Sequence, residues 1–323
     1  LLATPSALEG PKADFPARDL MSLWNGHIQS STGQQALQYE GQAFDYGWLE
    51  AESNRLAHHL KRQGVAADSP VGLCFDRSPE FVVGVLAVLK AGGAFVPLDP
   101  KWPADRQAFV LQDCGAGWLL GHEAVPGFEG ALIGFSTEAD WRSESAEPLD
   151  TLIEPAQAAY LIYTSGTSGI PKGVVVSHGA IANYVQGLLQ TIEPSPKATM
   201  AMVSTVAADL GHTTLFGALC SGRTLHLLSA DRVMDADAFA SYMAEHQVDI
   251  LKIVPTHLSA LLQATDSARV LPREALILGG EALPAALLRQ VRELTPGCRV
   301  FNHYGPSEST VGVLTTEPGD EQD

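Results

Sequence analysis

Residues 160–173 read Tyr-Leu-Ile-Tyr-Thr-Ser-Gly-Thr-Ser-Gly-Ile-Pro-Lys-Gly, and no other stretch says as much about the chain. An apolar run typical of a strand leads into small hydroxyl residues and glycines, and Lys172 closes the loop. Glycines let backbone N–H groups approach a polyphosphate, hydroxyl groups donate hydrogen bonds, and the lysine supplies charge. The spacing is not that of a Walker P-loop. A flexible Ser/Gly linker is the alternative, but linkers are seldom flanked by apolar runs such as 161–163 and 174–176.

The loop resembles the phosphate loop of the adenylate-forming superfamily, which includes nonribosomal peptide synthetase adenylation domains, acyl-CoA synthetases and luciferases. Four further stretches resemble motifs of the superfamily in the same order, namely residues 44–49, 89–99, 208–219 and 302–310. One departure is Ala208, where the family usually has an aromatic residue. Members use ATP to convert a carboxylate into an acyl-adenylate, release pyrophosphate, and then pass the acyl group to a thiol.

Composition sets limits that agree with this resemblance. The 323 residues are 46% hydrophobic and 18% charged, as expected of a soluble globular protein. A net charge of -17 argues against a nucleic-acid partner. No apolar run has the length of a membrane helix, so we expect no membrane partner. The four cysteines lie far apart, which favours free thiols in a reducing cytoplasm.

Strands and helices alternate along the chain, which predicts an α/β fold with two mostly parallel sheets flanked by helices. We expect a linker over 1–16, a first α/β subdomain over 17–150, and a second over 151–323 with the phosphate loop and the substrate pocket. Expected strands lie near 71–75, 94–98, 117–120, 159–163, 199–203, 224–228, 249–254, 275–279 and 299–304. Expected helices lie near 49–63, 79–90, 104–114, 178–190, 210–220, 235–246, 256–264 and 284–294.

The resemblance implies a binding site for ATP and Mg²⁺. Tyr304 would stack on adenine, Glu308 would ligate the metal ion, and Thr164 and Lys172 would act with Glu308 in catalysis. A structural turn at 279–282, a core tyrosine and a surface glutamate are the alternatives. The expected nucleotide-binding residues are Thr164, Ser165, Gly166, Thr167, Ser168, Gly169, Lys172, Gly280, Glu281, Ala282, Asn302, Tyr304, Gly305 and Ser307.

The resemblance also implies an amino-acid pocket. Asp209 takes the place of the aspartate that pairs with the substrate α-ammonium, which disfavours fatty and aryl acids. The expected pocket residues are Asp209, Leu210, Thr213, Lys252, Ile277, Gly279, His303, Val311 and Gly312.

Two of these residues point to the substrate side chain. Lys252 interrupts an apolar strand, where an unpaired lysine costs several kcal/mol and needs a partner or an exit to solvent. With His303 it offers two potential cations on one wall, and the set resembles the aspartate signature of peptide synthetases. The asparagine signature has a glutamate in place of His303, because an amide needs an acceptor. Alternatively, Lys252 reaches the surface and His303 is a core histidine.

Family members continue considerably beyond the last motif, into a small mobile domain that carries a catalytic lysine. We therefore expect this chain to lack the C-terminal small domain and to be inactive or very slow alone. The acceptor would be a carrier-protein phosphopantetheine thiol, with neighbouring synthetase domains and natural-product synthesis implied. The alternatives are an acyl-CoA synthetase and a non-catalytic binding scaffold.

Overall fold

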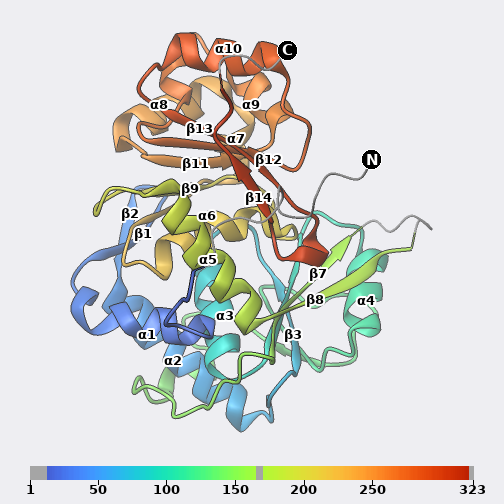
Figure 1. Ribbon diagram of the computed structural model, residues 1–323. Helices are drawn as coiled ribbons and strands as arrows, with labels where there is room; N and C mark the ends of the chain where they lie inside the picture. Colours follow the sequence, from blue (N-terminus) through green and yellow to red (C-terminus); the bar gives the residue numbers. More distant parts are fainter. Residues whose placement is uncertain (1–12, 165–169, 320–323) are drawn as a thin grey trace, which may run out of the picture.

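The computed structural model describes residues 13–164 and 170–319, which form two mostly parallel sheets flanked by helices (Figure 1). One sheet has the order β14 (Leu314–Thr316), β13 (Arg299–Tyr304), β12 (Ala275–Gly279), β11 (Ile250–Ile253), β9 (Met200–Met202), β10 (Leu225–Leu227), β1 (Gln35–Tyr39) and β2 (Gln42–Asp45). The other has the order β6 (Ala131–Ile133), β5 (Trp118–Gly121), β3 (Pro70–Cys74), β4 (Ala94–Leu98), β7 (Ala158–Thr164) and β8 (Lys172–Ser177). Antiparallel pairing joins β1 to β2, β13 to β14 and β7 to β8. The predicted fold class is confirmed.

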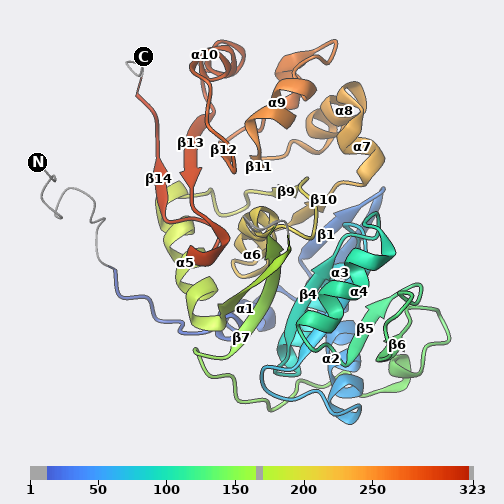
Figure 2. The same ribbon diagram turned by 90° about the vertical axis from the view of Figure 1, so that its right-hand side faces the viewer.

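Ten α-helices lie in the described part of the chain and cover these sheets. They are α1 (Leu20–Ser31), α2 (Tyr46–Arg62), α3 (Pro79–Lys90), α4 (Ala104–Asp113), α5 (His178–Ile192), α6 (His212–Leu219), α7 (Ala230–Met234), α8 (Ala236–His246), α9 (Pro255–Leu261) and α10 (Ala285–Leu294). Helices α8, α9 and α10 cover the outer face of the eight-stranded sheet, and α4 covers the outer face of the six-stranded sheet (Figures 1 and 2). The largest apolar core lies between the two sheets and includes α3, α5 and α6.

Polar side chains fix where several helices begin. Asp45, Ser78 and Ser177 each accept a hydrogen bond from a backbone N–H in the first turn of α2, α3 and α5. This satisfies one of the donors that a helix start leaves without a partner. The caps therefore help to set the ends of the strands and loops that precede these helices.

The two sheets do not divide at residue 150, where we expected a subdomain boundary. Strands β7 and β8 follow that residue but pair within the six-stranded sheet, whereas β1 pairs with β10 of the second half and carries β2 with it. The eight-stranded sheet thus combines both halves of the chain, because β1 pairs in parallel with β10, which lies far from it in the sequence. The subdomain division itself remains a prediction.

The predicted strands and helices are confirmed to within about three residues at most ends. The structure adds α1, α7, β1, β2, β6, β8 and β14, which the sequence analysis did not assign. In the part of the chain that the structure describes, no helix has both the length and the apolar character that crossing a membrane requires.

Candidate functional site

A cavity of about 490 Å³ opens where β9, β11, β12 and β13 end at their carboxyl edges. This is where ligands bind in open parallel sheets. Of the predicted pocket residues, Asp209, Leu210, Lys252, His303 and Val311 line the cavity. Gly280, Gly305 and Ser307, predicted to bind nucleotide, line the same cavity. The structure thus brings together residues that the sequence assigned to two neighbouring sites.

Asp209 begins the short 3-10 helix Asp209–Gly211, directly before α6. Its side chain is buried, and burial raises the pKa of its carboxyl group, whereas hydrogen bonds from Ser307 and the Val311 backbone and the charge of Lys252 oppose this shift. Within the described residues, Oδ2 of Asp209 has no hydrogen-bond partner. Because a buried carboxylate oxygen without a partner is costly, this atom is suited to an incoming ammonium group.

Lys252 and His303 are both buried and lie in direct contact. Nζ of Lys252 is 2.6 Å from Nδ1 of His303. Burial lowers the pKa of Lys252 to about 7, although Asp209 opposes this shift. Burial, assisted by the charge of Lys252, lowers the pKa of His303 to about 3. The pair therefore offers one positive charge at most near neutral pH, which corrects the expectation of two cations.

Tyr184 on α5 is a residue of this site that the sequence analysis missed. Its hydroxyl group is 3.1 Å from Nε2 of His303 and 2.8 Å from Oγ1 of Thr213. Tyr184 occupies the buried face of an amphipathic helix and belongs to no motif, so its sequence position indicated only a core residue. Thr213 does not line the cavity but supports it from behind through this bond.

Gly279 and Gly312 make room for the Lys252–His303 pair. A Cβ atom at position 279 would lie 3.2 Å from Nζ of Lys252 and would overlap the His303 carbonyl oxygen. A Cβ atom at position 312 would overlap the imidazole ring of His303. Neither glycine lines the cavity, and Ile277 is fully buried in the core between the sheets. The two glycines thus act on the pocket through Lys252 and His303, and Ile277 lies outside the cavity lining.

The loop that follows β13 contains two residues with a strained backbone conformation next to the site. Thr310 and Val311 have φ angles of 65° and 62°, in the left-handed region that β-branched residues avoid. Such conformations cost about 1–3 kcal/mol each and gather at functional sites. Here the conformation places Val311 on the cavity wall and its backbone against Asp209.

The other predicted nucleotide residues surround the cavity less closely. Tyr304 is 64% exposed, so a face of its ring is available for stacking. Glu281 instead accepts hydrogen bonds from the backbone N–H and the hydroxyl group of Thr256, at 3.0 and 2.8 Å. Ala282 is exposed in the same loop, and Asn302 lies within β13.

The phosphate loop is described only at its two ends. Thr164 and Lys172 are register partners in the antiparallel pair β7–β8, which places the ends of the loop side by side. The remaining predicted phosphate-binding residues, Ser165, Gly166, Thr167, Ser168 and Gly169, lie outside the described residues.

Glu308 lies in the 3-10 helix Ser307–Ser309, which contacts β8. The described residues contain no group of three or more His, Cys, Asp or Glu side chains arranged to hold a metal ion. One exposed carboxylate agrees with Mg²⁺, which usually takes one or two carboxylates and completes its shell with phosphates and water. Glu308 lines another cavity, beside β8, rather than the one described above, and its role as a metal ligand remains a prediction.

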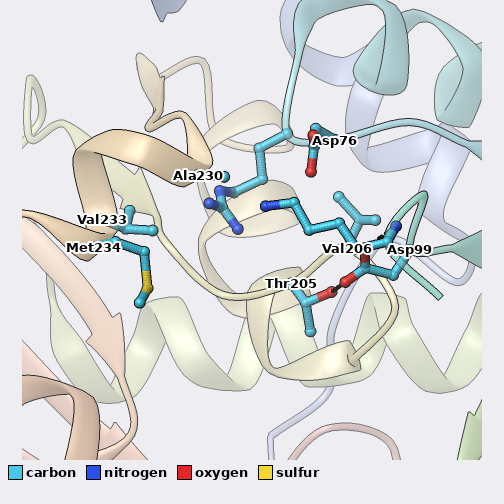
Figure 3. A pocket seen from close by; sticks show the side chains of 9 residues that line it. Asp76, Asp99, Thr205, Val206, Ala230, Val233 and Met234 are labelled. Atoms are coloured by element: carbon cyan, nitrogen blue, oxygen red, sulfur yellow. Dashed lines mark hydrogen bonds between the residues drawn. The ribbon is translucent and has the colours of Figure 1, made fainter.

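Figure 3 shows a second cavity, of about 170 Å³. It shares Thr205 with the first cavity. The hydroxyl group of Thr205 donates to Asp99 over 2.9 Å, which joins the end of β9 to the end of β4 in the other sheet. Buried Arg77 donates to the carbonyl oxygens of Ser204 and Leu228 at 2.9 and 2.6 Å. The six-stranded sheet thus holds the segment that leads to Asp209.

Comparison with known proteins agrees with this geometry. A model of the family described as AMP-binding enzyme matches residues 26–323. The chain is 32% identical over 300 residues to surfactin synthase subunit 2 from Bacillus subtilis strain 168, a match that covers 91% of this chain. It is 33% identical over 314 residues to tyrocidine synthase 3 from Brevibacillus parabrevis, a match that covers 94% of this chain.

Solved structures show the same fold. The AMPPNP-bound form of the nonribosomal peptide synthetase FmoA3 superposes with a TM-score of 0.87 at 25% identity, over 97% of this chain and 34% of that one. Its form bound to α-methyl-L-serine-AMP superposes with a TM-score of 0.86 at 26% identity, over 94% of this chain and 35% of that one. The chain spans 8% and 5% of the two synthases, so it corresponds to a small part of such proteins.

Proposed function

This chain belongs to the AMP-binding enzyme family, and we propose that it is the large part of an adenylation domain that activates L-aspartate for nonribosomal peptide synthesis. The relatives are surfactin and tyrocidine synthases, and the similar solved structures are of a nonribosomal peptide synthetase, which supports an amino-acid substrate and a larger protein around this chain. The substrate class and the acceptor thiol belong to the proposal.

The observation that carries the proposal is the placement of Asp209 and Lys252 on one buried cavity. Oδ2 of Asp209 has no hydrogen-bond partner among the described residues, and Lys252 uses one of its three donors on His303, so both side chains can still bind a ligand. An α-amino acid with a carboxylate side chain presents an ammonium group to Asp209 and an anion to Lys252. Charge-assisted hydrogen bonds of this kind contribute about 1.5–3 kcal/mol each.

In the proposed reaction the substrate α-carboxylate attacks the α-phosphorus of ATP, which yields aspartyl-adenylate and pyrophosphate. The chain contributes position and charge rather than a nucleophile. Lys172 and the loop that it closes would hold the phosphates, and the exposed ring of Tyr304 would stack on adenine. Mg²⁺ on Glu308 would offset phosphate charge when it is bound. The aspartyl group would then pass to the phosphopantetheine thiol of a carrier protein.

Pocket chemistry favours aspartate over asparagine. Both nitrogen atoms of His303 are engaged by Lys252 and Tyr184, so the wall offers donors to a side-chain carboxylate but no carboxylate acceptor for an amide NH₂. We expect at least a tenfold preference in kcat/KM, which corresponds to about 1.4 kcal/mol.

The test is amino-acid-dependent ATP–pyrophosphate exchange on the complete domain in its native protein. We expect exchange with aspartate to be much faster than with asparagine or glutamate. Equal rates with aspartate and asparagine would overturn the proposal that the pocket selects an acidic side chain.

Calorimetry on the present chain, with sulfamoyl analogues of aspartyl- and asparaginyl-adenylate, tests binding separately. A non-catalytic scaffold would give no saturable heat, and an acyl-CoA synthetase would require coenzyme A for product formation.

A further inference from the structure

Four buried side chains behind the cavity form one continuous chain of hydrogen bonds. Lys252 on β11 is 2.6 Å from Nδ1 of His303 on β13, and Nε2 of His303 is 3.1 Å from the hydroxyl group of Tyr184 on α5. That hydroxyl group is 2.8 Å from Oγ1 of Thr213 on α6. Each of the four is less than 9% exposed, so water does not compete for these bonds.

The charge of Lys252 sets the direction of the chain. A lysine ammonium group has three donors and no acceptor, so Nδ1 of His303 must accept from it. A neutral imidazole then carries its proton on Nε2 and donates it to the oxygen of Tyr184. In the bond between Tyr184 and Thr213 either hydroxyl group can donate. While Lys252 is charged, the two bonds of His303 are satisfied in this direction and in no other.

We propose that Tyr184 is a positioning residue for side-chain specificity: by accepting from Nε2–H of His303 it stabilises the tautomer that a charged Lys252 requires, so that the remaining N–H groups of Lys252 bind a ligand carboxylate. This rests on the proposed function for the identity of the ligand. His303, with both ring nitrogens engaged, positions Lys252 and does not bind the ligand itself. Asp209 is the other charged group that faces Lys252, and it recognises the opposite end of the ligand.

The first readout is the protonation pattern of His303, measured from the ¹⁵N chemical shifts of its ring. His303→Gln identifies the resonances. We expect wild-type His303 to carry its proton on Nε2. In Tyr184→Phe the Nε2–H group loses its acceptor, so we expect a shift toward the Nδ1–H tautomer, in which Nδ1–H donates to a neutral Lys252 amine. An unchanged pattern in Tyr184→Phe would overturn the proposal.

Tyr242→Phe is a matched control. The hydroxyl group of Tyr242 is 2.9 Å from Nδ1 of buried His226, and neither residue lines the cavity. This variant also removes a phenolic hydroxyl group from a buried histidine, so it reproduces the general cost to stability. We expect it to leave the His303 resonances unchanged.

The second readout is binding of the two sulfamoyl adenylate analogues, with AMP as a reference. We expect Tyr184→Phe to reduce the preference for the aspartyl analogue by about fivefold or more, with AMP affinity unchanged. Tyr242→Phe should retain the preference. A retained preference in Tyr184→Phe, or an equal loss in both variants, would contradict the specificity role.

If Tyr184→Phe does not fold, Thr213→Val is the second variant. It removes the partner that orients the Tyr184 hydroxyl group, which can then turn and donate to Nε2 of His303, so we expect a partial shift of the His303 pattern and a smaller preference for the aspartyl analogue. If neither readout changed, the proposal would be overturned. Two further outcomes separate this proposal from the proposed function. If wild type shows the Tyr184-dependent tautomer but no preference for the aspartyl analogue, the proposed function fails while the positioning of His303 stands. A tautomer independent of Tyr184, together with a clear aspartyl preference, would reject Tyr184 and support the proposed function.

Discussion

Gly312 lies so close to the imidazole ring of His303 that a methyl group at position 312 would overlap the ring. The ring is buried and bonded on both sides, so it has no room to move without breaking contact with Lys252 or Tyr184. The glycine thus determines the site although it does not line the cavity.

Gly312→Ala should therefore impair recognition of an acidic side chain. We expect the affinity for the aspartyl sulfamoyl analogue to fall tenfold or more, about 1.4 kcal/mol, with little change in AMP affinity. Calorimetry on both ligands measures this. Gly297→Ala is the control, because a Cβ atom at position 297 would meet no atom within 4 Å. Equal affinities in Gly312→Ala and wild type would show that the ring is not held in place by this contact.

Lys252→Met should change how stability depends on pH. The pKa of Lys252 is lowered to about 7 in the folded chain, below its ordinary value of 10.5, because burial disfavours the charged form. Between these values the unfolded chain binds more protons, so the wild-type free energy of unfolding rises with pH across this range. We expect the variant to be more stable than wild type by about 1–3 kcal/mol near pH 6, and the gain to shrink as the pH rises above about 7. Urea denaturation at several pH values measures the difference.

Lys90→Met provides the contrast for this prediction. Lys90 is also buried, but it donates to Glu50, Ser53 and Asn54 at 2.6, 2.8 and 2.7 Å. Removing it leaves Glu50 without its ion-pair partner, so we expect a loss of about 3–5 kcal/mol rather than a gain. If both variants were more stable than wild type near pH 6, the burial of each lysine, and not its hydrogen-bond partners, would decide whether its removal raises or lowers the free energy of unfolding.

Thr205→Val should loosen the connection between the sheets shown in Figure 3. The variant loses the hydrogen bond to Asp99, worth about 1 kcal/mol, and frees the segment that leads to Asp209. In ATP–pyrophosphate exchange on the complete domain in its native protein, we expect a higher KM for the amino acid and little change in the KM for ATP. Thr191→Val is the control, because its hydroxyl group bonds to the Gly187 carbonyl within its own helix. A rise in both KM values would indicate general damage instead.

Local patterns of apolar and capping residues were enough to predict most helices and strands of the fold. Buried parallel strands such as Ala275–Gly279 read as continuous apolar runs, and helices such as Pro79–Lys90 begin at a capping residue followed by proline. The hairpin β1–β2 was missed, although Glu40 and Gly41 both have positive φ angles as a tight hairpin requires. Glu-Gly is a weaker signal for this turn than Asn-Gly. The parallel pairing of β1 with β10 depends on contacts distant in sequence, which no local pattern contains.

Site residues that belong to sequence motifs could be predicted, and site residues outside the motifs could not. Motif positions led to Asp209, Lys252 and His303, which the structure places on one cavity. Their charge states depend on burial and on a 2.6 Å separation between side chains 51 residues apart, so the sequence suggested two cations where the structure supports one. Tyr184 could be found only from its contact with His303 on β13, a residue that lies 119 positions away in the sequence.

Thr310→Gly should separate stability from binding. Thr310 has a φ angle of 65°, which glycine adopts without the clash that a β-branched side chain suffers. Relief of this strain exceeds the entropic cost of a new glycine, so we expect the free energy of unfolding to rise by about 1 kcal/mol. The same change frees Val311, whose backbone holds Asp209, so affinity for the aspartyl analogue should fall about threefold or more.

Glu193→Gly is the control, because Glu193 caps α5 at a φ angle of 42° and lies outside the cavity. We expect it to stabilise the chain without changing affinity. A gain in both stability and affinity for Thr310→Gly would show that the strained loop does not preorganise the site.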